Sequence, residues 1–200
     1  AINALREKGI GAIVDIVLNH KAGGDEKERF QVYKVDPNNR QNFISEPFEI
    51  ESYTKFTFPG RGEKYSDFKW NFQCFSGVDF AEGQDEGIFQ IINDHGDGWE
   101  EMVSDEKGNY DYLMYNDIDQ RNPFVREELN NWGKWYHDQI HFDGVRLDAV
   151  KHQSPEFYKE WLYTLRANTK KNIFAVGEYW APGELPLLEK YIEATEGSMS

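Results

Sequence analysis

Apolar positions follow two different spacings along this chain. Residues 10–18 (IGAIVDIVL) are dense in β-branched side chains, which predicts a buried strand after the helical end at residues 1–9. Residues 145–150 and 173–177 are two further short apolar runs, and stretches with helical spacing precede and follow them. Strands that alternate with helices in this way predict an α/β fold with a parallel sheet.

Helix-start signals support this order of elements. Asn122 is the expected N-cap of a helix with Pro123 at its first position, and Ser154-Pro155 marks the start of the next helix. A third helix is expected at residues 185–192. Because three strands cannot close a barrel, we expect an arc of parallel strands with the helices that cover it.

Residues 21–122 have a different character. They are rich in glycine, acidic and aromatic residues, and no helical spacing persists in them. Connections in α/β units are usually a few residues long, so an insertion of this length predicts a subdomain after the first strand. Residues 53–58 alternate and predict one of its short strands. We therefore expect residues 1–20 and 123–200 to form one layered unit and residues 21–122 to form an inserted, β-rich domain.

Composition narrows the classes of partner. With 39% hydrophobic residues among 200, the chain can bury a core. A net charge of −14 excludes partners that need a basic surface, such as nucleic acid or an anionic membrane. No apolar run is long enough to span a bilayer. Cys74 is the single cysteine, so no intrachain disulfide is possible, which fits a reducing compartment.

The two ends of the chain suggest a segment of a longer protein. Residues 1–9 resemble the end of a helix, with neither an initiator methionine nor a signal peptide, and residues 196–200 stop where another strand is expected. We expect a monomer in the cytoplasm, with secretion as the alternative because the true N-terminus is missing.

Two acids follow the later strands, thirty residues apart. Asp148 lies near the C-terminal end of the run at 145–150, and Glu178 follows the run at 173–177. The C-terminal ends of parallel barrel strands carry catalytic groups, and paired carboxylates are the machinery of glycoside hydrolysis. Arg146 and Asp148 are two residues apart and share a face, so Arg146 is expected to keep Asp148 ionised, as a nucleophile requires.

Glu178 is expected to have a different environment. No cation lies on its own strand, and Tyr179 and Trp180 follow it. Partial desolvation among aromatic side chains raises the pKa of a carboxyl group, as a general acid needs. The alternative is that Arg146 and Asp148 form a structural ion pair, and that Glu178 is a solvated acid at a strand end.

These residues lie in motifs that resemble the α-amylase family of glycoside hydrolases. The strings are DIVLNH at 15–20, GVRLDAVKH at 144–152 and VGEYW at 176–180. Two more strings resemble the bacterial liquefying branch of the family: FPGRGEKYSDFKW at 58–70 and GNYDYLMYNDID at 108–119. Two others, CFSGVD at 74–79 and DEGIFQIIND at 85–94, resemble the intracellular members of that branch. The resemblance extends over nearly the whole chain.

The resemblance implies strands 3 to 5 of a (β/α)8 barrel, with the large domain inserted after strand 3. It implies hydrolysis of internal α-1,4-glucosidic bonds in starch or glycogen with retained configuration. Asp148 would be the nucleophile, Glu178 the acid/base and Arg146 the partner of the aspartate. Contacts with sugar are implied for His20, Lys151, Tyr179 and Trp180. The third catalytic acid of the family belongs to a later strand, so we expect these 200 residues alone to have little or no activity.

Acidic residues also cluster between positions 111 and 119. Asp111, Asp117 and Asp119 supply the hard oxygen ligands that Ca²⁺ takes, although a solvated acidic loop explains the same pattern. The resemblance implies one calcium, held by Asn19, Asp111, Asp117 and the backbone carbonyl of His152.

The same resemblance places further cations of some relatives at Asp79, Glu100 and Asp119. Here Glu100 stands where an aspartate is usual, and Arg121 occupies an acidic position. A guanidinium beside a second cation site is unfavourable, so we expect a single calcium.

Three other functions remain open. A related transglycosylase or an α-1,6-glucosidase would use the same acids, and a non-catalytic α-glucan-binding scaffold would use the same surface without turnover.

Overall fold

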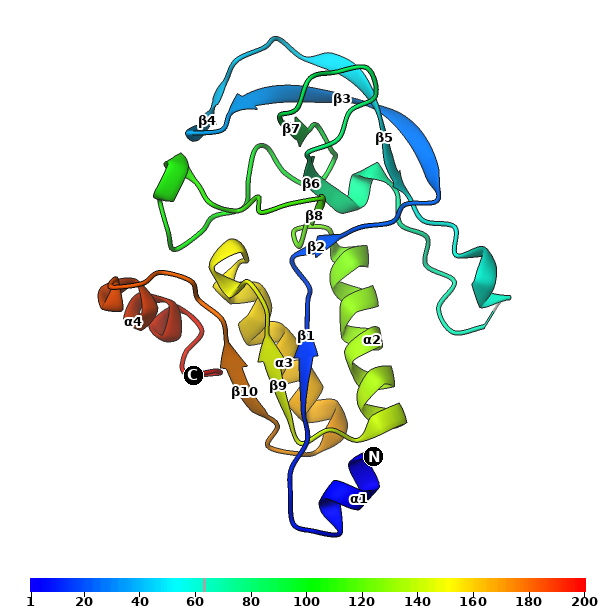
Figure 1. The fold of residues 1–200 in the computed structure, drawn as a ribbon, viewed down its shortest axis with the longest axis vertical. Helices are drawn as coiled ribbons and strands as arrows, with labels where there is room; N and C mark the ends of the chain where they lie inside the picture. Colours follow the sequence, from blue (N-terminus) through cyan, green and yellow to red (C-terminus); the bar gives the residue numbers. More distant parts are fainter. Residues whose placement is uncertain (63) are drawn as a thin grey trace.

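The computed structural model describes residues 1–62 and 64–200 and contains two sheets (Figure 1). The first sheet is parallel and has the order β1-β9-β10, with β1 at Ile13–Ile16, β9 at Gly144–Leu147 and β10 at Phe174–Gly177. Helices α2 (Pro123–Ile140) and α3 (Pro155–Thr169) pack against each other beside this sheet. The predicted α/β class with a parallel sheet is therefore confirmed.

Alternation along the strands decides which side chains are buried. Val145 and Leu147 are fully buried against the helices, as are Phe157 and Trp161 of α3. The run at 10–18 was expected to be a buried strand, and this is only half right. Ile16 is 1% exposed. Ile13 points to the opposite face of the strand, which is the open face of the sheet, and is 57% exposed.

The helix starts are close to those expected. Asn122 caps α2, because its Oδ1 accepts hydrogen bonds from the backbone N–H of Phe124 and Val125. Helix α3 begins after Ser154, although the Ser154 side chain makes no capping hydrogen bond. Two further helices are α1 (Ile2–Arg6) and α4 (Leu185–Ala194).

The second sheet is built from residues between β1 and α2. Its order is β2-β8-β6-β7-β3-β4, and β5 also pairs with β3; all of these pairings are antiparallel. The strands are β2 (His20–Lys21), β3 (Glu26–Asp36), β4 (Asn39–Phe43), β5 (Phe48–Lys55), β6 (Phe75–Val78), β7 (Ile88–Ile91) and β8 (Asn116–Ile118). The 3₁₀ turns are η1 (Pro59–Arg61), η2 (Phe72–Cys74), η3 (Glu106–Gly108) and η4 (Val150–His152).

The strand expected at 53–58 begins earlier, because Phe48–Lys55 pairs along β3, and Phe56 makes only an isolated bridge to Trp70. In Figure 1 the second sheet lies above the C-terminal ends of the parallel strands. One continuous apolar core includes side chains of both sheets, among them Ile16, Phe75 and Leu147. In the described part of the chain, no helix has the length and apolar character needed to cross a membrane.

Candidate active site

Three carboxylates surround one guanidinium group at the ends of the parallel strands. Asp15 of β1 lies opposite Arg146 of β9 in the strand register, while Asp148 and Glu178 directly follow β9 and β10. Arg146 Nη1 is 2.6 Å from Asp15 Oδ1 and 2.7 Å from Asp148 Oδ1, and its Nη2 is 2.8 Å from Glu178 Oε2. The pairing expected between Arg146 and Asp148 is confirmed.

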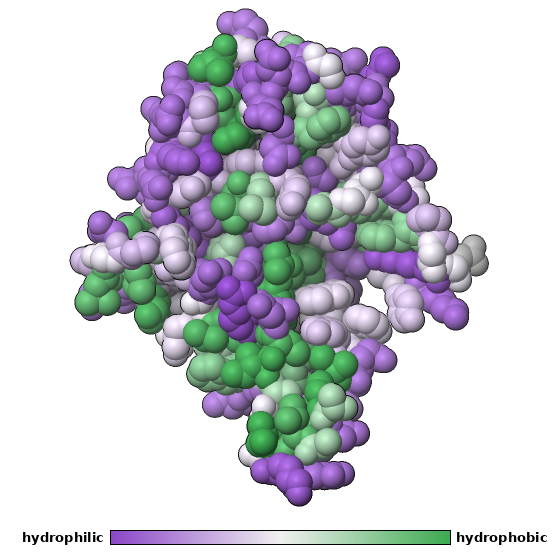
Figure 2. All heavy atoms as spheres, viewed as in Figure 1, coloured by the Kyte–Doolittle hydropathy of each residue, from purple (hydrophilic) through white to green (hydrophobic). Residues whose placement is uncertain are grey.

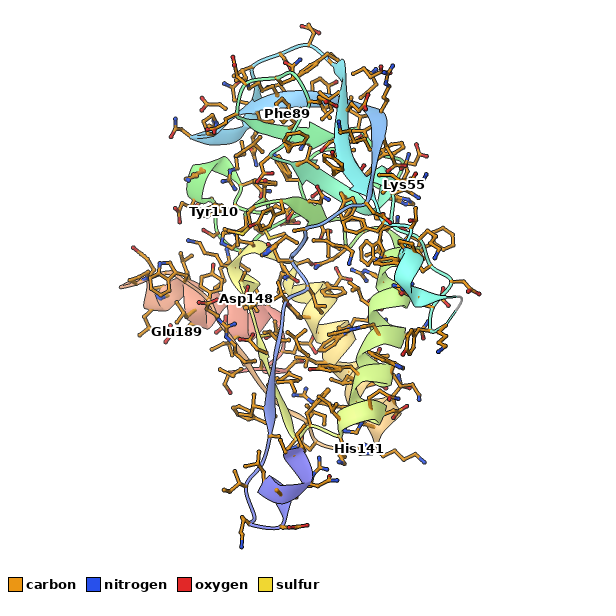
Figure 3. All side chains as sticks on the ribbon, turned by 45° about the vertical axis from the view of Figure 1, so that its right-hand side comes forward. Lys55, Phe89, Tyr110, His141, Asp148 and Glu189 are labelled. Atoms are coloured by element: carbon orange, nitrogen blue, oxygen red, sulfur yellow. The ribbon has the colours of Figure 1, made fainter. Side chains whose placement is uncertain are left out.

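The surroundings of Arg146 are therefore strongly negative. Asp15 makes the largest contribution to a raised pKa of the Arg146 guanidinium, and Asp148 and Glu178 raise it further. Since all three acids contact the same group, their heads face the same side of the sheet. In Figure 3, Asp148 lies where the first sheet meets the second.

As expected, the strand before Glu178 carries no cation. A cation nevertheless reaches Glu178 from the neighbouring strand, because Arg146 lies within ion-pair distance. Parallel pairing of β9 with β10 creates this contact, because Arg146 lies opposite Val176, two residues before Glu178. The Glu178 side chain is 39% exposed, so this ion pair remains open to solvent.

The backbone after Asp148 turns sharply. Ala149 has φ +53° in the left-handed region, which costs about 1 kcal/mol for a residue with a Cβ. The chain then enters η4, so that Lys151 and His152 lie beside Glu178. Two backbone bonds attach this turn to β10, from Glu178 N–H to the Leu147 carbonyl and from Val150 N–H to the Glu178 carbonyl. A strained conformation held in this way is typical of functional sites.

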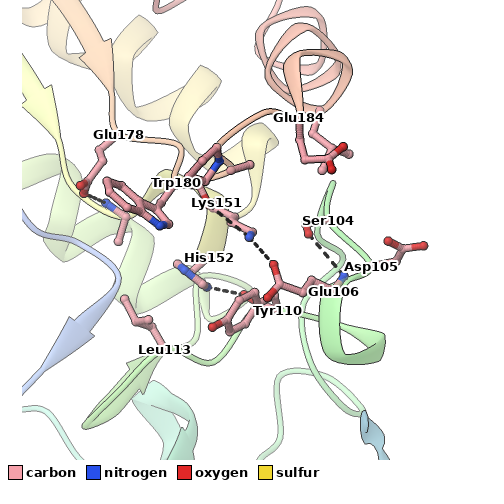
Figure 4. A pocket seen from close by; sticks show the side chains of 14 residues that line it. Ser104, Asp105, Glu106, Tyr110, Leu113, Lys151, His152, Glu178, Trp180 and Glu184 are labelled. Carbon is pink, nitrogen blue, oxygen red and sulfur yellow. Dashed lines mark hydrogen bonds and ion pairs between the residues drawn. The ribbon is translucent and has the colours of Figure 1, made fainter. Parts of the chain in front are cut away.

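A cavity of about 820 Å³ opens beside Glu178 (Figure 4). Glu178, Lys151 and Trp180 border it from the first sheet, and Glu106 and Tyr110 border it from the loop before β8. Lys151 joins the two sides, because its Nζ pairs with the Glu106 carboxylate and lies 3.2 Å from the Trp180 carbonyl oxygen and 4.9 Å from the Tyr110 ring centre. The cavity thus combines aromatic surface with a few charged groups, as small-molecule sites do.

The other residues expected to contact sugar lie elsewhere. Tyr179 does not border this cavity; its ring packs 5.1 Å from that of Tyr191 in α4 and lines a smaller cavity of about 130 Å³. His20 is the first residue of β2, with its Nδ1 3.0 Å from Asn19 Oδ1 and its ring 5.7 Å from that of Tyr115. Burial lowers the pKa of His20, and the negative charge of Asp148 opposes that shift.

Sequence reasoning missed Glu106 and Tyr110. Neither belongs to a strand end or to a helix stripe, and Glu106 is one of 36 acidic residues in the chain. The Lys151 contact lowers the pKa of Glu106. No local signal separates Glu106 from the other acids of its loop.

The residues expected to hold calcium are brought together where β8 of the second sheet meets the segments that follow β1 and β9 of the first. Asn19 Nδ2 lies 2.7 Å from the His152 carbonyl oxygen and 3.4 Å from Asp117 Oδ1. Asp111 and Asp117 are 4% and 1% exposed, and burial raises the pKa of both, with the charge of Asp117 adding to the effect on Asp111. Neither acid has an ion pair with a lysine or arginine in the described residues.

This donor set fits a hard cation chemically. Buried carboxylates that lack a positive partner gain most from one, and carbonyl, amide and carboxylate oxygens are the ligands that Ca²⁺ prefers. The Asn19 amide needs a half-turn to present its oxygen, which leaves its shape unchanged. Across residues 1–62 and 64–200, no three His, Cys, Asp or Glu side chains form a metal cluster by themselves, so the fit depends on the amide and the carbonyl.

Arg121 supplies the positive charge next to this centre. Its Nε and Nη2 lie 2.9 and 2.8 Å from the two oxygens of Asp119, which is fully buried and also accepts a 2.7 Å bond from Asn93. Although burial opposes it, the Arg121 contact lowers the pKa of Asp119. Asp119 is therefore already neutralised by a residue of this chain.

Comparison with known proteins connects this geometry to a family. The sequence is 47% identical over 199 residues to the cytoplasmic alpha-amylase of Escherichia coli (strain K12) and 43% identical over 195 residues to the alpha-amylase of Bacillus licheniformis, and each alignment covers 98% of this chain. It is 42% identical over 202 residues, covering all of this chain, to the glucan 1,4-alpha-maltohexaosidase of Bacillus sp. (strain 707). The chain is homologous to a segment of the bacterial α-amylases. The predicted family resemblance is thereby confirmed.

The chain spans 38 to 40% of the length of those three relatives. No model of a protein family matches it. The α-amylase of Geobacillus thermoleovorans, solved in complex with acarbose, matches the structure with a TM-score of 0.53 over 97% of this chain and 31% of that chain. Its sequence identity is 19%, so this likeness shows a shared fold.

Proposed function

We propose that the protein containing this segment hydrolyses internal α-1,4-glucosidic bonds of starch or glycogen with retention of configuration. One observation carries the proposal: Asp148 and Glu178 follow adjacent parallel strands and contact one guanidinium, beside a large cavity with aromatic walls. Retaining glycosidases need two carboxyl groups roughly 5–5.5 Å apart, and a shared Arg146 supports such a spacing. The first sheet would be strands 3 to 5 of a (β/α)8 barrel, with residues 21–122 as its inserted domain.

In the first step, Glu178 donates its proton to the glycosidic oxygen while a carboxylate oxygen of Asp148 attacks the anomeric carbon. The bond to the leaving sugar breaks, and a glycosyl ester forms on Asp148. Glu178 then takes a proton from water, the water oxygen attacks the anomeric carbon, and Asp148 is released. Arg146 stabilises the Asp148 carboxylate in both steps.

The acid role of Glu178 requires that the Arg146 contact be broken in the working enzyme. Glu178 Oε2 lies 2.8 Å from Arg146 Nη2, whereas the first step needs the Glu178 carboxyl group to face the glycosidic oxygen. We propose that substrate entering the cavity separates Glu178 from Arg146. Asp15 and Asp148, which contact the other nitrogen of the guanidinium, would hold Arg146 in place.

Lys151 and Trp180 are proposed to contact sugar from the cavity wall, and His20 from the start of β2. Calcium would be held by Asn19, Asp111, Asp117 and the His152 carbonyl. When bound, it would neutralise the buried carboxylates and so stabilise the junction of the two sheets.

The decisive experiment uses the full-length protein and maltoheptaose. Wild-type enzyme is expected to release products whose new reducing ends are initially α-anomers by proton NMR, and Glu178→Gln is expected to bind maltoheptaose without turning it over. Initial β-anomers would exclude retention. Cleavage restricted to α-1,6 bonds, or products longer than the substrate, would instead indicate the debranching or the transglycosylating alternative.

Two properties of the whole protein are also proposed. The 200-residue segment alone is expected to be inactive, because the resemblance to the α-amylase family implies a third catalytic acid on a later strand; turnover of starch by the purified segment at the full-length rate would refute this. We further propose a cytoplasmic monomer, consistent with the name of the Escherichia coli relative and with a single cysteine. Cell fractionation and analytical ultracentrifugation test these two points.

A further inference from the structure

A second groove lies on the other side of α2, away from the candidate active site. It has a volume of about 540 Å³ and is formed by the segment after β5, with Arg61, Tyr65 and Ser66, and by one face of α2, with Glu128 and Trp135. It has no lining residue in common with the cavity beside Glu178. Figure 2 shows the surface hollowed at this place, to the right of α2.

Two aromatic rings form a corner in this groove. Tyr65 is 74% exposed and Trp135 is 40% exposed, and their ring centres lie 5.6 Å apart with an angle of 69° between the planes. Tyr65 has φ +69°, a left-handed conformation that is unfavourable for a bulky side chain. Strain and exposed aromatic surface at one place are features that folding alone does not favour, and both are typical of binding sites.

Polar groups are held in position around the aromatic corner. Arg61 Nη1 donates hydrogen bonds to the carbonyl oxygens of Ser66 and Phe68, at 2.8 and 3.3 Å, and the guanidinium carbon lies 3.7 Å from the Phe58 ring centre. Glu128 Oε2 accepts a 2.7 Å hydrogen bond from the Ser66 hydroxyl. These bonds engage one guanidinium nitrogen and one carboxylate oxygen, so both donors and acceptors are presented at fixed positions.

The combination points to a neutral ligand with one apolar face and a rim of hydroxyl groups. Arg61 and Glu128 balance each other, and the chain carries a net charge of −14, which disfavours phosphates and polyanions. A purely apolar ligand would leave both charged groups desolvated and unpaired. A pyranose ring has C–H bonds on one face that pack on aromatic rings, and hydroxyl groups at its edge that bond to arginine and carboxylate.

We propose that this groove is a second α-glucan-binding site, which holds the polymer while another part of it enters the active site. The choice of α-glucan rests on the proposed function, whereas the geometry by itself specifies a neutral pyranoside. Tyr65 and Trp135 stack against a sugar ring, and Arg61 and Glu128 bind its hydroxyl groups.

The test uses full-length protein and two substrates, insoluble starch granules and soluble maltoheptaose. Tyr65→Ala and Trp135→Ala are each expected to weaken granule binding in a sedimentation assay by about five- to tenfold, as the loss of one aromatic contact predicts. The ratio of kcat/KM on granules to kcat/KM on maltoheptaose is expected to fall by a similar factor. Tyr163→Ala is the matched control, because Tyr163 on α3 is 75% exposed and lies outside the groove.

Three results would overturn the proposal. Unchanged granule binding in both groove variants would exclude the site, and an equal loss with Tyr163→Ala would show a general surface effect. Shielding of Trp135 from acrylamide in full-length protein without sugar, seen by comparing its fluorescence with that of Trp135→Phe, would show that another segment fills the groove. Failure of the proposed function is distinguishable, because wild-type protein would then bind granules through the groove without hydrolysing maltoheptaose.

Discussion

Two groups of carboxylates lie within this chain, and they differ in how their charge is compensated. Asp148 and Glu178 are partly exposed at strand ends and have the guanidinium of Arg146 between them. Asp111 and Asp117 are almost completely buried and have no such partner among the described residues. A carboxylate with a built-in cation and open access suits repeated chemistry, whereas a buried carboxylate without one suits a resident cation.

The largest effect is expected when the proposed nucleophile is removed. Asp148→Asn in the full-length protein is expected to lower kcat on maltoheptaose by about 10⁴-fold or more, because the amide cannot form the ester intermediate. Asp15→Asn is the matched control, since Asp15 contacts the same guanidinium but is 63% exposed at its side chain. The decrease in kcat for Asp15→Asn is expected to be at least a hundred times smaller than that for Asp148→Asn. Equal decreases in kcat would mean that the two acids do not differ in role.

The two arginines offer a second comparison. Arg146→Met is expected to lower kcat by about 10²- to 10³-fold with a modest change in stability, because the Arg146 ion pairs are open to solvent. Arg121→Met is expected to reduce the free energy of unfolding by about 3 kcal/mol, because it leaves fully buried Asp119 without its cation. Urea unfolding and steady-state kinetics on both variants check this, and a reversed pattern would contradict the assignment.

Calcium tests the buried group directly. Excess Ca²⁺ added to chelator-treated full-length protein is expected to raise the free energy of unfolding by about 2.7 kcal/mol at a hundred times its Kd. Asp117→Asn is expected to abolish most of that gain. Asp85→Asn, which removes an exposed acid of the same domain, should retain it. A gain that survives Asp117→Asn would place the cation elsewhere.

The smallest expected effect concerns the contact between the two sides of the cavity. Glu106→Gln removes the ionic partner of Lys151 and is expected to raise KM for maltoheptaose by a few-fold, with kcat nearly unchanged, because the Glu106 side chain of this pair is 51% exposed. Exposed Glu101→Gln is the control.

The pH dependence of the Glu106 contact has a definite sign. The pKa of Glu106 is lowered by Lys151, so the contact is fully present above the ordinary glutamate pKa and is lost as the pH falls through the lowered value. The KM difference between wild type and Glu106→Gln should therefore disappear in acid. A difference that persists there would mean that Glu106 acts through something other than its charge.

Much of the first sheet was predictable because its signals are local. The strands predicted at 145–150 and 173–177 and the helices after Asn122 and Ser154 follow from apolar spacing and from start signals. The first of these strands ends earlier than predicted, at Leu147, because the chain turns at Ala149 into η4. The exposed half of β1 was missed, since a dense apolar run does not reveal which of its faces remains uncovered. The antiparallel sheet was expected only in outline, because its pairings depend on register between distant residues.

The residue types at the strand ends can be read from the sequence alone, since an acid after an apolar run is visible in a few consecutive positions. Three contacts follow only from the fold: Arg146 with Glu178, Tyr179 with Tyr191 of α4, and Tyr65 with Trp135. Those contacts join residues on different elements, and strand register and loop path bring them together. Burial and charge compensation are properties of that arrangement, because the same carboxyl group behaves differently beside a guanidinium and beside another acid.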